Sequence, residues 1–323
     1  MKTRPYLAKA PYLFSVLILF SATGSEAATG AWEMRASGQA TVAGYSGSDL
    51  RDSLFSAGFF IGGDYLEQGG VTLGYNYTEV EGKASNPGDF DTLEENTFYL
   101  SGKVHSYSDG LSGKLSWRLD GYFIQDDANI KGKKGQADGN ESIWSDGDIG
   151  VLNPVVGLIN NEQSRAFDLG YAYSNYDYDG FDDYQVHQLT PTFGFAPGGA
   201  ANWVQLRGYF IHLSDDDVND GNSDTQALEA KWTHWPGPHA LFGLHSVGLN
   251  VLVGERFLAV DPDAAVVYTL ADEQQGSIAL NGSWNLGDQT SLMLQVGYEQ
   301  FENRALNDDY DSAYLYLNLS HRW

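Results

Sequence analysis

The chain has 323 residues, with 43 acidic and 18 basic side chains, no cysteine, and a high aromatic content of 14%. Its formal net charge of −25 excludes a general nucleic-acid binder, because phosphate recognition draws its affinity from basic patches. The lack of cysteine excludes disulfide-stabilised domains, cysteine-ligated metal sites and thiol enzymes, and the aromatic content excludes a disordered chain.

The first 27 residues have the pattern of a cleaved signal peptide. A basic start with Lys2 and Lys9 precedes the apolar run 12–20, and small residues around Ala27 suit cleavage before Ala28. The apolar run is much shorter than the ~20 residues that a membrane-spanning helix needs. We therefore expect residues 1–27 to be a signal peptide and residues 28–323 to form one domain.

From there on, apolar and polar residues alternate with a period of two. In the segment 114–123, Leu115, Trp117 and Leu119 are separated by single polar residues. Because successive side chains of a strand point to opposite sides of a sheet, this pattern predicts a strand with one apolar and one polar face. The same alternation recurs at 71–78, 98–104, 167–174 and 292–299.

In chain order the pattern predicts fourteen strands, longer than the roughly five or six residues usual in globular sheets. They are 31–45, 53–65, 70–81, 96–107, 112–125, 148–159, 164–176, 184–195, 201–213, 225–234, 239–254, 276–286, 290–301 and 312–323. Asn153 and Pro154 interrupt one strand, and 264–270 could form another or extend one, which leaves twelve or sixteen strands as alternatives.

The connections between these strands alternate in length. Short turns are predicted at 66–69, 108–111, 160–163, 196–200, 235–238 and 287–290. Longer and mostly acidic loops are predicted at 82–95, 126–147, 177–183, 214–224, 255–275 and 302–311. Short turns at one end, long loops at the other and an even strand number are the sequence signature of an outer-membrane barrel with both termini in the periplasm.

The last strand strengthens this interpretation. Leu315, Leu317 and Leu319 alternate with polar residues, and the chain ends on the aromatic Trp323. This strand resembles the C-terminal strand of Gram-negative outer-membrane β-barrel proteins, although His321 departs from the usual pattern. The resemblance is porin-like and identifies no specific substrate family. It implies an all-β, antiparallel, up-and-down transmembrane barrel in the cell outer membrane, and partners that include lipid, lipopolysaccharide and the barrel assembly machinery, which would recognise Leu319 and Trp323.

A barrel of this size should enclose a water-filled lumen, because eight strands already provide room for packed side chains and sixteen leave a channel. The polar faces of the strands assign to that lumen a nearly balanced set of charges. These are Arg35, Lys103, Lys114, Arg118, Asp120, Arg207, Glu229, Lys231, Glu299 and Arg322.

Folding two strands about the 108–111 turn predicts that Lys103 lies opposite Ser116 and that Ser101 lies opposite Arg118. Like charges that face each other destabilise a sheet unless they are neutralised. The lumen charges therefore form either a salt-bridge lattice that makes the barrel rigid or a basic wall that attracts anionic groups.

The acidic loops are expected to form a solvated rim that enriches cations at the outer mouth. An exception is the 126–147 loop, which carries Lys131, Lys133 and Lys134. We hypothesise that this loop folds inward and narrows the pore.

The sequence evidence for an enzyme is weaker than that for a channel. His212, Ser214 and Asp215 near one strand end are the best constellation, but their spacing assigns no second catalytic group. We expect no enzyme activity, cofactor or metal site.

The sequence predicts passive diffusion of small hydrophilic solutes or ions, with a transporter for an anionic nutrient or a closed structural or adhesion barrel as alternatives. A homo-oligomer is possible.

Overall fold

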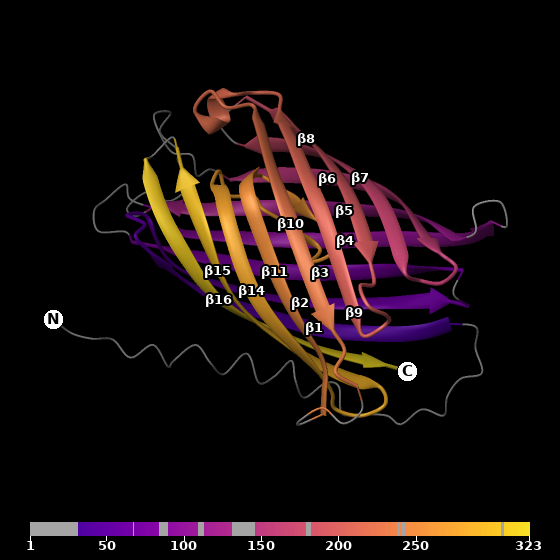
Figure 1. Ribbon diagram of the computed structural model, residues 1–323. Coiled ribbons are helices and arrows are strands. Elements are labelled where there is room, and N and C mark those ends of the chain that lie inside the picture. Colours follow the sequence, from indigo (N-terminus) through magenta and orange to yellow (C-terminus); the bar gives the residue numbers. More distant parts are fainter. Residues whose placement is uncertain are drawn as a thin grey trace.

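The computed structural model describes residues 32–66, 68–83, 90–108, 113–130, 146–178, 182–237, 240, 243–304 and 307–323. Within these residues fourteen antiparallel strands close into one barrel, in which β1 pairs with both β2 and β16 (Figure 1). The predicted number of fourteen is confirmed. The predicted signal peptide, 1–27, lies outside the described residues.

The barrel strands are β1 (Trp32–Ser46), β2 (Arg51–Tyr65), β3 (Gly69–Gly82), β4 (Phe90–Ser108), β5 (Gly113–Ile130), β6 (Gly147–Asn160), β7 (Arg165–Tyr178), β8 (Tyr184–Phe195), β9 (Asn202–Leu213), β10 (Asp224–His234), β11 (Leu244–Phe257), β14 (Glu273–Asn285), β15 (Thr290–Asn303) and β16 (Asp308–Arg322). A short 3₁₀ helix, η4 (Asp217–Asn219), lies between β9 and β10. Two further short strands, β12 (Val260–Asp261) and β13 (Val266–Val267), pair only with each other. No helix in the described part of the chain is long and apolar enough to cross a membrane.

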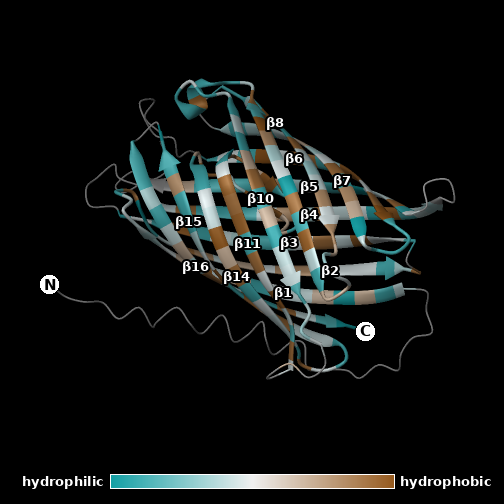
Figure 2. Ribbon diagram, viewed as in Figure 1, coloured by the Kyte–Doolittle hydropathy of each residue, from teal (hydrophilic) through white to brown (hydrophobic). Residues whose placement is uncertain are grey.

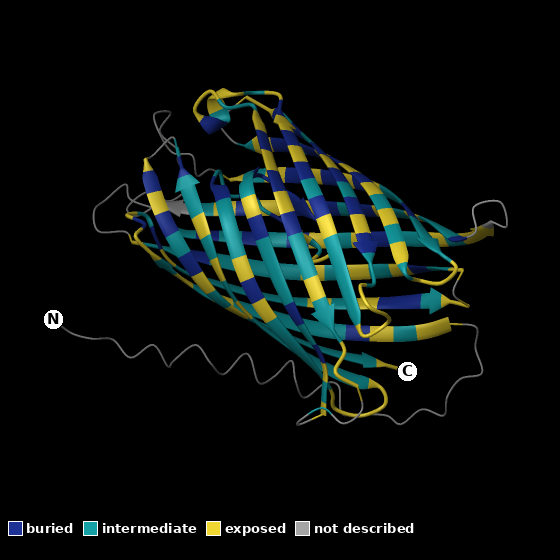
Figure 3. Ribbon diagram, in the orientation of Figure 1, coloured by how far each residue is buried: buried dark blue, intermediate teal, exposed yellow. Residues whose placement is uncertain are grey.

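The period-two pattern directs apolar side chains to the outside of the barrel. Trp117 and Leu119 on β5 are 54% and 52% exposed, whereas the neighbouring Asp120 is fully buried. Alternating exposed and buried positions continue around the barrel (Figure 3), and apolar residues recur on the strands between the polar ends (Figure 2). So large an exposed apolar surface is stable only against lipid. The chain is therefore a transmembrane barrel of the outer-membrane type.

Pro154 does not break β6, although it removes a hydrogen-bond donor. The β6–β7 ladder pairs Leu152 with Tyr173 and Val155 with Gly170, and it skips the two residues between them. Proline lacks the N–H group that the ladder would use. The neighbouring Asn153 turns its side chain inward and donates to Asp120 at 3.2 Å.

We assign the end with the short turns and both described termini to the periplasm, following the loop asymmetry of outer-membrane barrels. At the opposite, extracellular end β4 and β5 extend beyond the predicted strands, to Phe90 and Ile130. The segment 264–270, which the sequence left open as an additional strand, contributes β13 and does not enlarge the barrel.

Candidate functional site

The segment 258–272 between β11 and β14, here called the inner loop, folds from the extracellular end into the lumen. Leu258, Ala259 and Val260 are at most 1% exposed, as expected for residues enclosed by the barrel wall. The sequence predicted an inward fold for 126–147 instead. Lys131, Lys133 and Lys134 of that loop lie outside the described residues, so their role stays a prediction.

The inner loop packs on an apolar area of the inner wall. Phe257 at the end of β11 and the loop residues Leu258 to Val260 and Val267 form one cluster with buried side chains of β5 to β9. These are Tyr122, Ile124, Ile149, Val151, Tyr176, Tyr184, Val186, Ile211 and Leu213. The inner faces of β5–β9 are therefore apolar near the extracellular end, where the alternation predicted a polar face. Apolar side chains are stable there because the inner loop removes them from water.

Gln188 of β8 adds a polar contact within this apolar area. Its amide nitrogen donates to the Val260 carbonyl at 2.7 Å, and its amide oxygen accepts from the Val260 N–H at 3.0 Å. The side chain thus satisfies both backbone groups of a buried loop residue, which would be costly to leave unpaired.

At its tip the inner loop binds two of the predicted lumen cations. The Asp263 carboxylate accepts from Arg207 Nη2 at 2.8 Å and from Lys231 Nζ at 2.9 Å. Glu229, which lies directly opposite Arg207 across β9 and β10, is 3.3 Å from the same lysine. Burial raises the pKa of Asp263, but Lys231 and Arg207 outweigh that effect and hold the pKa well below its usual range.

At its far end the inner loop is bound by residues that the sequence did not single out. Asp272 forms a buried ion pair of 2.6 Å with Arg51 of β2, and Asn303 of β15 donates to the same carboxylate at 2.9 Å. Thr269 donates to Glu95 of β4 at 2.6 Å. In the sequence, the only hint of a role for Arg51 was its position as an isolated arginine at an acidic rim. The inner loop thus crosses the lumen from the β8–β9 wall to the β2–β4 wall.

Nearer the periplasmic end, two more of the predicted lumen cations form ion pairs. Lys103 Nζ lies 2.6 Å from Asp64, and Arg118 Nε lies 3.0 Å from Asp120. Asp120 also accepts from Ser101 at 2.7 Å. These contacts correspond to the salt-bridge lattice rather than to an unpaired basic wall.

The predicted register across β4 and β5 was wrong by two residues. Lys103 lies opposite Arg118, and Ser101 lies opposite Asp120. The last pair before the turn is Ser108 with Gly113, so the connection is 109–112 rather than 108–111. A shift of two keeps every side chain on its predicted face, because the strand period is two.

The remaining predicted lumen residues have different environments. Arg35 Nη2 lies 3.4 Å from the Thr72 hydroxyl. Glu299 accepts from Gln274 at 2.8 Å. The Lys114 ammonium lies 5.8 Å from the centre of the Tyr107 ring at the periplasmic end, and the exposed Arg322 lies 3.7 Å from Glu33.

A cavity of about 960 Å³ remains beside the inner loop, mainly against β1–β4 and β14–β16. Its lining runs from Arg35 and Arg322 near the periplasmic end to Tyr45 and Tyr310 near the extracellular end. Many lining side chains are neutral and polar: Ser37, Gln39, Thr41, Ser56, Asn76, Thr97, Asn250, Ser277, Asn281, Gln295, Asn318 and Ser320.

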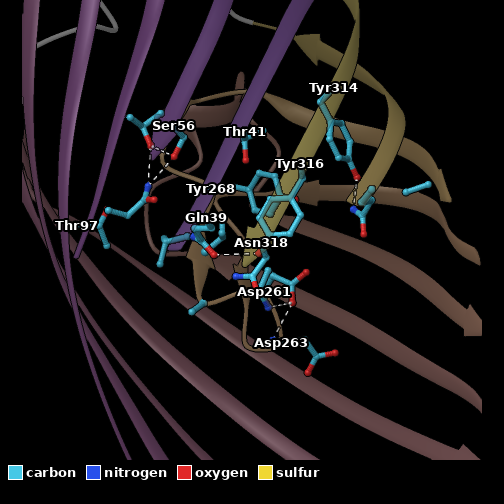
Figure 4. A pocket seen from close by; sticks show the side chains of 18 of the residues that line it. Gln39, Thr41, Ser56, Thr97, Asp261, Asp263, Tyr268, Tyr314, Tyr316 and Asn318 are labelled. Carbon is cyan, nitrogen blue, oxygen red and sulfur yellow. Dashed lines mark hydrogen bonds between the residues drawn. The ribbon is translucent and has the colours of Figure 1, made fainter. Parts of the chain in front are cut away.

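Three of the tyrosines that line the cavity, Tyr268, Tyr314 and Tyr316, are labelled in Figure 4. Tyr316 donates to Gln39 at 3.0 Å, and Gln295 donates to the Tyr314 hydroxyl at 2.7 Å. The Arg256 guanidinium lies over the ring of Tyr268 of the inner loop, 4.4 Å from the ring centre. Pattern reasoning placed 255–275 in an external loop, so it missed Arg256 and Tyr268 as lumen residues.

The predicted catalytic constellation does not assemble. His212 Nδ1 is 2.9 Å from Asp224, and both side chains are more than half exposed. Ser214 instead accepts from the Gln185 N–H at 2.8 Å. No group of three or more potential metal-ligating side chains occurs among the residues that the structure describes.

The predicted assembly signal lies at the seam that closes the barrel. Leu319 is paired with Gly38 of β1, and the Trp323 N–H donates to the Met34 carbonyl at 3.0 Å. The Trp323 side chain is 46% exposed. Its recognition by the assembly machinery stays a prediction.

No family model and no curated protein matches this sequence. Among solved structures, a TodX deletion mutant, described as a monoaromatic hydrocarbon channel, is similar with a TM-score of 0.59 and 7% identity over 91% of each chain. CymD, described in the same words, has a TM-score of 0.56 and 6% identity over 90% of this chain and 88% of its own. At such identities the likeness shows the fold, which is that of outer-membrane β-barrel channels.

Proposed function

We propose that this chain is a passive outer-membrane channel for small hydrophilic solutes, and that the cavity beside the inner loop is its permeation path. The observation that carries the proposal is the neutral polar lining of that cavity. Serine, threonine, asparagine and glutamine side chains exchange hydrogen bonds with water at little cost, so they suit a wetted path.

The inner loop supports a selective rather than a wide pore. It packs against β5–β9, and the cavity of about 960 Å³ lies mainly on the other side of the loop. Solutes would pass between this loop and the wall formed by β1–β4 and β14–β16. Acidic residues at the outer rim would concentrate cations there, because carboxylates at a pore mouth attract them.

A dedicated transporter for an anionic nutrient is less well supported. The anion would bind to Lys103, Lys114, Arg118, Arg207 and Lys231. Four of these are already paired with a carboxylate, and Lys114 lies against the Tyr107 ring. An entering anion would have to displace these partners. A closed structural barrel remains the outcome to expect if the inner loop never moves and the cavity conducts no ions.

A channel for hydrophobic compounds is the second candidate. The apolar area beneath the inner loop favours it, since displacement of that loop would expose Ile124, Ile149 and Val186 to the lumen. TodX and CymD, which are similar in fold, are described as monoaromatic hydrocarbon channels.

Liposome swelling tests the proposal. We expect vesicles that contain the purified protein to swell in small uncharged polar solutes, with rates that fall steeply as solute size increases. Empty vesicles provide the control. Uptake of toluene without any polar-solute flux would favour the hydrophobic candidate, and no flux of either kind would favour a closed barrel.

A further inference from the structure

We infer that the cavity binds an uncharged, polyhydroxylated ring, such as a monosaccharide, between the inner loop and β16. This inference rests on the proposed channel function and adds the chemical class of the solute. The binding groups are the rings of Tyr268, Tyr314 and Tyr316 together with the neighbouring amides and hydroxyls of β1 and β16, including Gln39 and Asn318.

The charges of the wall argue for a neutral ligand. Each charged side chain that lines the cavity has a polar partner within the protein, and most of these partners carry the opposite charge. The bound charged residues are Arg35, Glu95, Lys103, Arg118, Glu229, Lys231, Arg256, Asp261, Asp263, Asp272, Glu299 and Arg322. A charged solute would have to replace these contacts to gain affinity, whereas a neutral solute needs to break none of them.

The tyrosines provide oriented apolar faces. Tyr314 and Tyr316 each form a side-chain hydrogen bond, and Tyr268 lies against Arg256. Side chains held in this way lose little conformational freedom when a ligand arrives, so more of the contact energy contributes to affinity. An aromatic face packs well on the flat C–H face of a sugar ring, and the phenol oxygen bonds with its hydroxyls.

The amides and hydroxyls around the tyrosines supply the complementary polar contacts. Gln39 and Asn318 carry donors and acceptors on one side chain, as a sugar hydroxyl does. Ser37 and Ser320 extend this polar surface toward the periplasmic end, and Thr41 extends it toward the extracellular end. The cavity of about 960 Å³ lies within the range of ligand pockets, and it combines aromatic faces with a few polar groups in the same way.

Current block in planar bilayers tests the inference. We expect D-glucose to reduce the ionic current of the reconstituted protein in a saturable manner, with gluconate, its carboxylate analogue, at least about fivefold weaker. Poly(ethylene glycol) of similar size controls for simple volume exclusion, which does not saturate. Tyr316→Ala should weaken the glucose block about tenfold, because the aromatic face is lost.

Two further variants keep the result interpretable. Tyr316→Phe retains the ring and should keep most of the block, while Tyr298→Ala on the outward face of β15 should leave it unchanged. Electrophoretic mobility before and after heating shows which variants are folded barrels. A conducting protein that glucose does not block, or blocks no better than the polymer, would overturn the inference and leave the channel function intact. A folded protein without conductance would instead refute the channel function.

Discussion

Asp263 binds Arg207 and Lys231 from a loop that is distant in sequence from β9. We expect Asp263→Asn to weaken the attachment of the loop tip by about 1–2 kcal/mol, less than for a fully buried pair, because the carboxylate is 39% exposed. Single-channel recording should show a higher mean conductance and more frequent gating.

Asp215→Asn is the matched control, since Asp215 is an exposed acidic residue whose carboxylate accepts from the nearby Asp217 N–H. Identical gating of the wild-type protein and the Asp263→Asn variant would show that the carboxylate does not hold the loop.

The lowered pKa of Asp263 predicts how this attachment depends on pH. A carboxyl group with a depressed pKa contributes stability that is complete above its unfolded-state pKa and is lost only as the pH falls through the depressed value. The loop-dependent part of the conductance should therefore be constant from pH 5 to pH 8. A rise in conductance within that range that Asp263→Asn abolishes would contradict this prediction.

At the residue scale the sequence predicts which side chains face the lumen but not their partners. The faces of Lys103, Arg118 and Asp120 follow from the period of two. The pairing of Lys103 with Asp64 depends on the arrangement of three strands, and a register shift of two is invisible to the pattern. The partner Asp263 comes from a segment without strand alternation, so no pattern could assign it.

The inner loop determines how much of the lumen is open. Replacement of residues 259–271 by a short glycine–serine linker should raise the conductance several-fold, because the loop occupies space in the lumen along β5–β9. The same replacement should also expose the apolar inner wall, which an environment-sensitive apolar dye would report.

Shortening the periplasmic turn 196–200 between β8 and β9 is the control, because it lies at the opposite end of the barrel. An unchanged conductance after removal of 259–271 would mean that the inner loop does not limit the path.

The sequence contained a signal for this element, since apolar residues such as Leu258, Val260 and Val267 are unusual in an otherwise acidic set of loops. Alternation alone could not distinguish a strand from a segment folded into the lumen.

The whole barrel is predictable because one physical rule acts on every strand. Lipid outside and polar groups inside impose the same alternation fourteen times, and closure is required because unpaired edges are costly in hydrocarbon. The content of the lumen follows no such repeat. It depends on one loop and its contacts with several strands.

The lipid-facing belt gives a prediction at the scale of the molecule. Leu119→Arg places a charge on the outer face of β5 and should destabilise the membrane-inserted barrel by about 2–4 kcal/mol if it lies near the bilayer centre. Thr41→Arg, which faces the cavity, should cost much less. Urea titration of the two variants in vesicles measures the difference, and equal stability would argue against a lipid-facing position for Leu119.

Because the chain has no cysteine, a single introduced thiol tests the central claim of a water-filled path without background labelling. Thr41→Cys should react with a membrane-impermeant, charged thiol reagent in a planar bilayer, and each reaction should reduce the single-channel current in one step. Leu119→Cys should remain unmodified in the lipid. An unreactive Thr41→Cys, or a reaction that leaves the current unchanged, would contradict a permeation path beside the inner loop.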